Sequence, residues 1–104
     1  MNQKLKQIAD HFGPASQLSK LSEESRELWE AAEAYHHALV IEDDPDEIER
    51  ARAHLIEEMA DVFIVAEQVL YQEKANDYLE TMLDFKIQRT IDRIEEGYYG
   101  STRV

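Results

Sequence analysis

Apolar residues recur along the chain at helical spacing, and three segments interrupt the pattern. The first is Gly13-Pro14, the second is the acidic stretch 42–47, and the third is the polar stretch 74–77. No segment alternates apolar and polar residues for long enough to indicate a strand. The pattern therefore predicts an all-α fold, with a short amphipathic helix followed by three longer ones.

The expected third helix, which runs to about residue 72, carries the most apolar surface. Ile64, Val65 and Tyr71 fall outside its main apolar stripe, so its second half is apolar almost all round. Such a helix is buried from more than one side, by its own chain or by a partner subunit. A chain this short buries a limited fraction of its surface alone. We therefore expect a homo-oligomer, either a dimer or a dimer of dimers.

Capping residues mark two of the helix ends. Asp44 suits the N-cap of the third helix, Pro45 its first position, and Glu47 is placed as a capping-box partner three residues on. Gly97 is a natural C-cap for the last helix.

Trp29 and Tyr35 recur at helical spacing on the second helix, which indicates core residues rather than a base-stacking platform.

Length and charge narrow the class of protein. The 104 residues fit a single helical domain spanning 1–104. No apolar run is long enough for a membrane span, and the N-terminus lacks an apolar signal core, so a cytoplasmic location is expected. The net charge of −12 argues against binding nucleic acid through its phosphates. It does not argue against a small phosphorylated ligand, because divalent cations held by carboxylates supply positive charge.

Two pairs of acidic residues have the spacing that puts side chains on one helix face. The expected second helix carries Glu24 and Glu27. The third carries Glu58 and Asp61. Residues three apart project from neighbouring points of a helix, so two such pairs on facing helices would place four carboxylates around one site. Mg²⁺ prefers oxygen ligands of this kind.

Chance produces such pairs often, because Asp and Glu make up 23 of the 104 residues, and most of these pairs are solvated surface. The positions of these acids relative to the apolar stripes favour a metal site over solvated surface. Glu58 and Asp61 lie between the main apolar stripe and the apolar flank of the same helix, and Glu24 borders the stripe of the second helix. Burying unpaired carboxylates is costly, so acids aimed near a core tend to be paired or metal-bound.

The two acidic segments together resemble a known family. Residues 20–28 (KLSEESREL) and 57–64 (EEMADVFI) are similar to the paired E-x-x-E and E-x-x-D helices of the MazG-like nucleoside triphosphate pyrophosphohydrolases. The resemblance spans about residues 17–93. Both motifs, in this order and at this separation, are fairly specific, whereas either alone would be weak.

This resemblance implies a helical bundle of MazG-like type that is completed by dimerisation. It also implies Mg²⁺-dependent hydrolysis of a (deoxy)nucleoside triphosphate to the monophosphate and pyrophosphate, with Mn²⁺ as a substitute metal. The positions that match the family's catalytic metal ligands are Glu24, Glu27, Glu58 and Asp61.

Three basic residues share one face of the last helix. Lys86, Arg89 and Arg93 have the spacing i, i+3 and i+7, which suits a substrate phosphate-binding edge. The alternative is that these long side chains cover apolar surface and pair with nearby acids. Many family members carry an Asn where this chain has Thr90, which leaves the sugar or phosphate contact, and the substrate preference, open.

Two other functions are compatible with the sequence. Glu33 and His36 form a Glu-x-x-His motif, which di-iron carboxylate bundles use on two helices, but the chain has one copy. The second alternative is a non-catalytic helical module for dimerisation or partner binding, because function depends on the site rather than the fold. The sequence contains no phosphate-cradling glycine loop and no cysteine nucleophile.

Overall fold

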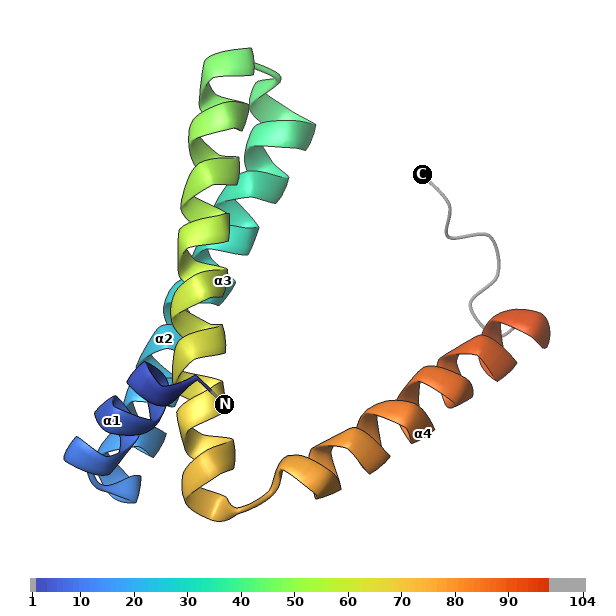
Figure 1. The fold of residues 1–104 in the computed structure, drawn as a ribbon. Coiled ribbons are helices and arrows are strands. Elements are labelled where there is room, and N and C mark those ends of the chain that lie inside the picture. The colour runs from blue at the N-terminus through green and yellow to red at the C-terminus, as the bar shows by residue number, and fades with distance from the viewer. Residues whose placement is uncertain (1, 98–104) are drawn as a thin grey trace. The chain divides into compact units, whose positions relative to one another are not determined.

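The computed structural model describes residues 2–97, which form α-helices and one π-helical segment, with no strand among them. The all-α prediction is confirmed. The chain divides into two compact units, Met1–Glu73 and Lys74–Val104. The first contains α1 (Gln3–His11), α2 (Pro14–His37), the π-helix η1 (Ala38–Glu42) and α3 (Pro45–Glu73), and the second contains α4 (Asn76–Glu95) (Figure 1). None of the described helices is long and apolar enough to cross a membrane.

Local chemistry separates α1 from α2 at the predicted place. Asn2 caps α1, because its Oδ1 accepts a hydrogen bond of 2.7 Å from the backbone N–H of Lys4. The helix ends where Phe12 adopts an extended conformation. Pro14 then occupies the first position of α2, where its missing N–H leaves no intrahelical bond unmade.

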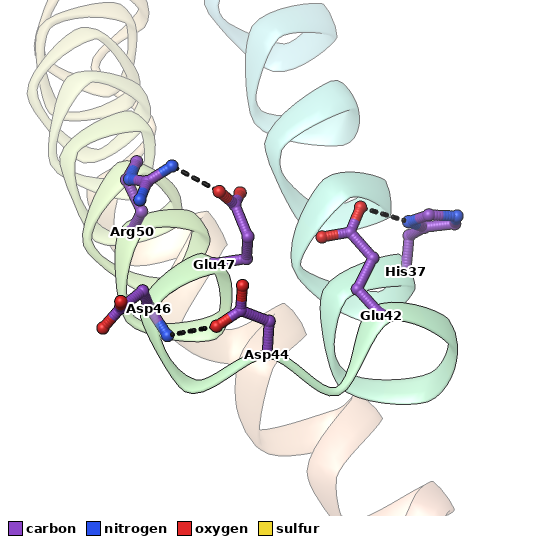
Figure 2. A network of polar contacts seen from close by, with 6 residues as sticks. All are labelled: His37, Glu42, Asp44, Asp46, Glu47 and Arg50. Atoms are coloured by element: carbon purple, nitrogen blue, oxygen red, sulfur yellow. Dashed lines mark hydrogen bonds and ion pairs between the residues drawn. The ribbon is translucent and has the colours of Figure 1, made fainter.

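The π-helix η1 ends α2 and turns the chain toward α3. The backbone N–H of Asp43 donates to the carbonyl of Ala38 at 3.0 Å. Asp43 itself has a φ of +51°, a left-handed conformation that Asp tolerates better than most residues. His37 Nδ1 lies 3.2 Å from Oε1 of Glu42, across the same turn (Figure 2).

The start of α3 is capped by an aspartate. Oδ1 of Asp44 accepts a hydrogen bond of 3.0 Å from the backbone N–H of Asp46, which confirms Asp44 as the N-cap (Figure 2). Pro45 is the first helical residue, as predicted. The capping-box role predicted for Glu47 is wrong, because its carboxylate pairs with Arg50 one turn later.

The helices α2 and α3 pack along each other as an antiparallel pair (Figure 1). The buried residues of α2 and η1 recur every seven positions, at Gln17, Glu24, Ala31 and Ala38. A seven-residue repeat keeps one seam of a helix facing its partner. Two of these seam positions hold polar side chains, so the interface departs from an apolar seam toward the N-terminus of α2.

The short helix α1 packs against the C-terminal half of α3 (Figure 1). Tyr71 OH donates to Oδ1 of Asp10 at 2.9 Å, a bond that raises the pKa of the tyrosine. Gln72 Nε2 donates to the backbone carbonyls of Ala9 and Phe12 at 2.9 and 3.0 Å. These polar contacts hold the end of α1 against α3.

Several large apolar side chains in the first unit lie on its surface. Trp29 is 64% exposed and Phe63 is 65% exposed. The prediction that Trp29 belongs to the core is therefore wrong, because the α2 seam follows Glu24 and Ala31 and leaves Trp29 outside it. On α3, Val65 is buried while Phe63 is not, so α1 and α2 cover only part of its apolar second half.

The second unit consists of α4 in its described part. Lys74 adopts a left-handed φ of +54° at the break before the helix. At the other end Gly97 has a φ of +75°, and its backbone N–H donates to the carbonyl of Ile94 at 3.0 Å. Glycine adopts this conformation without a Cβ penalty, so Gly97 ends the helix as predicted, in the position directly after the C-cap residue Glu96.

Candidate metal centre

Three of the four predicted ligands converge between α2 and α3. Glu24 and Glu27 extend from adjacent turns of α2, and Glu58 comes from α3. One carboxylate oxygen from each residue can be chosen so that all three lie within 4.8 Å of one another. Within residues 2–97 this is the one such grouping of acidic or histidine side chains.

Burial makes this cluster unusual for surface acids. Glu24 is 7% exposed, and the Glu58 side chain is 13% exposed. Oε2 of each of these two carboxylates is buried and has no hydrogen-bond partner in the described part of the chain. A buried carboxylate oxygen without a partner is costly, so the site is chemically incomplete without a donor or a cation.

Repulsion within the cluster raises the pKa of Glu27 above its ordinary value. The neighbouring charge of Glu24 is the largest cause that raises the pKa of Glu27, followed by desolvation, a hydrogen bond with Glu24 and the charge of Glu58. Like charges this close disfavour ionisation of the group between them. A divalent cation would remove the repulsion, because it binds the ionised form of each carboxylate.

Two basic side chains touch the rim of the cluster. Lys20 Nζ lies 3.2 Å from Oε1 of Glu24 and 3.8 Å from Oε1 of Glu23. The bond to Glu24 is the main cause that raises the pKa of Lys20. His54 Nε2 lies 3.8 Å from Oε1 of Glu58. The contacts to Glu24 and Glu58 engage Oε1 of each carboxylate, and the buried Oε2 of each has no hydrogen-bond partner within residues 2–97.

Asp61, the fourth predicted ligand, lies one turn after Glu58 on α3 but outside the group of three. It is exposed and lines a pocket of about 570 Å³ that opens beside Glu24. The walls of this pocket come from all three α-helices of the first unit, and they include Ile8, Phe12 and Val65. The acidic cluster therefore borders a cavity with apolar walls.

Two residues that we did not predict also line this pocket. Gln17 of α2 and Gln68 of α3 are 5% and 1% exposed, and Gln17 Nε2 donates to Oε1 of Gln68. The sequence carried a signal for both, since Gln17 precedes Glu24 by seven residues and Gln68 follows Asp61 by seven. The polar site thus continues for two helical turns along the same seam.

The predicted phosphate-binding residues lie on α4, in the second unit. The guanidinium carbon of Arg89 lies 5.7 Å from the centre of the Phe85 ring. The hydroxyl of Thr90 donates to the backbone carbonyl of Lys86 at 2.9 Å. Arg93 is half-buried on the same helix.

The two residues of the di-iron alternative lie on the surface. Glu33 and His36 are exposed on α2, and neither belongs to the acidic group.

Comparisons with protein-family models, with curated proteins and with solved structures find no match to this chain. The functional argument therefore depends on the sequence motifs and on the geometry of this site.

Proposed function

We propose that this protein is a Mg²⁺-dependent nucleoside triphosphate pyrophosphohydrolase of MazG-like type. The observation that carries the proposal is the cluster of Glu24, Glu27 and Glu58, with its three oxygens within 4.8 Å of one another. Two of these carboxylates each bury an oxygen that lacks a hydrogen-bond partner within residues 2–97. A solvated acidic surface would not leave carboxylate oxygens in that state.

The ligand set fits a hard cation. All three groups are carboxylates, and Asp61 lies one turn away from Glu58 as a fourth. Mg²⁺ takes oxygen ligands and usually binds through a few carboxylates together with waters and substrate phosphates. Thiolate ligands are excluded because the chain has no cysteine. Mn²⁺ prefers the same donors, so it should substitute.

The reaction adds water across the bond between the α- and β-phosphates, releasing a nucleoside monophosphate and pyrophosphate. When bound, the metal ion would supply positive charge that neutralises the phosphates and polarises the bond to be broken. Glu24, Glu27 and Glu58 would hold it, and α2 and α3 fix their relative positions. Lys20 pairs with Oε1 of Glu24 at 3.2 Å and partly neutralises its charge.

The neighbouring pocket supports a nucleotide rather than inorganic phosphate as the substrate. Its volume of about 570 Å³ falls in the usual range of small-molecule sites. Apolar side chains such as Ile8 and Val65 line it beside the polar groups.

We also propose that Lys86, Arg89 and Arg93 contact substrate phosphates. The enzyme would act as a homodimer in the cytoplasm.

Pyrophosphate release from a panel of nucleoside triphosphates, with Mg²⁺ and with EDTA, tests the function. We expect release of pyrophosphate that depends on the metal and is restored by Mn²⁺. Titration of Mg²⁺ into the nucleotide-free protein adds a readout that does not depend on turnover. If no ribo- or deoxyribonucleoside triphosphate tested releases pyrophosphate, the proposed enzymatic activity is refuted.

A non-catalytic dimerisation module is the second candidate, and the exposure of Phe63 and Trp29 favours it. Such a module would form dimers but would release no pyrophosphate, and its acidic cluster would be dispensable. The same assay therefore separates the two functions.

A further inference from the structure

The pocket beside the acidic cluster has an unusual polar pair in its wall. Gln17 and Gln68 lie 51 residues apart in the sequence and are more than nine-tenths buried. Both line the pocket together with Ile8, Phe12 and Val65. Buried amides in an apolar wall require hydrogen-bond partners.

The two amides satisfy each other only in part. Gln17 Nε2 donates to Oε1 of Gln68, and no further hydrogen bond to either amide occurs within residues 2–97. An amide offers two donors and one acceptor with two lone pairs. The carbonyl of Gln17 and the NH₂ group of Gln68 therefore keep their capacity to bind a ligand.

The position of the pair relative to the carboxylates matches a nucleoside. Gln17 stands seven residues before Glu24 on the same seam of α2, a rise of about 10 Å at about 1.5 Å per residue. That length is comparable to a nucleoside measured from its 5′ oxygen to the far edge of its base. Phosphates at the carboxylates would thus leave the base near the two amides.

We propose that Gln17 and Gln68 determine the base specificity of this protein by hydrogen-bonding the polar edge of the nucleobase. The proposal rests on the proposed function and adds to it the group that the pocket recognises. Each nucleobase presents a donor next to an acceptor on its Watson–Crick edge, in an order that differs between the bases, so one fixed acceptor and one fixed donor fit some bases and not others. Sites that hydrogen-bond a substrate group discriminate strongly against analogues that lack it.

The first experiment measures binding of the nucleosides of the common bases in metal-free buffer, by calorimetry or NMR, because a nucleoside carries no phosphate for the bare carboxylates to repel. We expect the wild-type protein to prefer one base over the others by about tenfold or more. Gln68→Met keeps the side-chain length and removes the hydrogen bonds, so it should reduce the preference to about threefold or less. Gln7→Met, at an exposed residue outside this pocket, is the matched control and should leave the preference unchanged.

The second experiment repeats the comparison as ratios of kcat/KM for the triphosphates with Mg²⁺. Gln17→Met provides an independent variant if Gln68→Met does not fold by circular dichroism. A merely structural tie between the helices would lower Tm and leave the ratios alone. Wild-type protein without a base preference, or folded variants that retain it, would overturn the proposal. Failure of all triphosphates to release pyrophosphate would refute the enzyme, while the binding preference would still test the amide pair.

Discussion

Lys20 Nζ lies 3.2 Å from Oε1 of Glu24, one turn along α2, while Oε2 of the same carboxylate is buried without a hydrogen-bond partner in the described chain. One oxygen is therefore paired with the ammonium group of Lys20, and the other is buried in the same acidic cluster as Glu27 and Glu58 without a hydrogen-bond partner within residues 2–97. The pairing therefore leaves Glu24 with one oxygen that still lacks a donor or a cation.

Replacement of Lys20 tests whether the lysine positions Glu24 or binds phosphate. If it only pairs with the carboxylate, Lys20→Gln removes a positive charge beside the metal site. Mg²⁺ affinity of the free protein should then rise by about two- to fivefold, as expected for a half-exposed pair, and KM for the nucleotide should hardly change. Calorimetric Mg²⁺ titration and steady-state kinetics measure both quantities. A tenfold fall in kcat/KM with unchanged Mg²⁺ affinity would assign Lys20 to the substrate instead; Lys4→Gln is the control.

Glu58→Gln should abolish Mg²⁺-dependent pyrophosphate release without unfolding the protein. The substitution removes a charged ligand at nearly constant volume and also relieves repulsion within the cluster. The metal-free variant should therefore melt no lower than the wild-type protein, while Mg²⁺ should no longer raise its Tm. Thermal melts with EDTA and with Mg²⁺ check this directly. Retained turnover would remove Glu58 from the ligand set.

Asp61→Asn tests whether the metal centre includes the fourth acid of the sequence motif or only the three glutamates that lie together in the structure. The family motif predicts that Asp61 is as necessary as Glu58, whereas the structure leaves it exposed and outside the group of three. We expect loss of turnover, because Asp61 is one turn from Glu58 and lines the pocket beside Glu24. Activity within about threefold of wild type, on the same assay, would restrict the metal centre to the three glutamates.

The stability of the metal-free protein should depend on pH through Glu27. Its pKa is raised in the folded protein, chiefly by the charge of Glu24, so its ionisation costs stability above that raised pKa. The cost is relieved as the pH falls through the folded pKa toward the ordinary value of 4.5. Glu27→Gln should therefore raise the metal-free Tm most at neutral pH, and the difference should vanish near pH 4.5. With saturating Mg²⁺ the sign should reverse; a difference that does not change with pH would contradict the coupling.

The basic residues of α4 should control substrate affinity rather than metal affinity. A lost charge-assisted hydrogen bond costs about 1.5–3 kcal/mol, so Lys86→Gln or Arg93→Gln should lower kcat/KM by about ten- to hundredfold. Mg²⁺ binding to the free protein should not change, because these residues would reach the metal only through substrate. Unchanged kinetics with a lowered Tm would instead identify the three residues as a structural face. Lys4→Gln is again a suitable control.

The helix boundaries were predictable because local chemistry determines them. Asp44 and Pro45 begin α3, and Gly97 ends α4, through preferences that act within a few residues of the chain. Glu47 shows the limit of this reasoning, since Arg50, one turn away, competes for its carboxylate.

The convergence of the carboxylates was predictable only as a hypothesis. Spacing within a helix puts Glu24 beside Glu27, but the approach of Glu58 depends on the register between α2 and α3. Register also explains the error on Trp29, because the seven-residue seam through Glu24 and Ala31 leaves that ring exposed. Gln17 and Gln68 were not predicted, because an isolated glutamine is usually a solvated surface residue. Only their seven-residue spacing from Glu24 and Asp61 relates them to the acidic site.

The exposed apolar surface of α3 predicts an assembly of at least two subunits. Phe63 is 65% exposed on α3, and we expect a homodimer or larger that buries it. In a symmetric dimer one substitution removes two side chains, and burial of a phenylalanine contributes about 1.5–3 kcal/mol. Phe63→Ser should therefore weaken the dimer by at least about a hundredfold. Ile41→Ser is a matched control, because Ile41 is similarly exposed, at 67%, but lies in the π-helix η1. Light scattering over a concentration series measures the mass of each protein. A monomeric wild-type protein at micromolar concentration would contradict the prediction and would weaken the proposed family with it, because that family's bundle is completed by a second subunit.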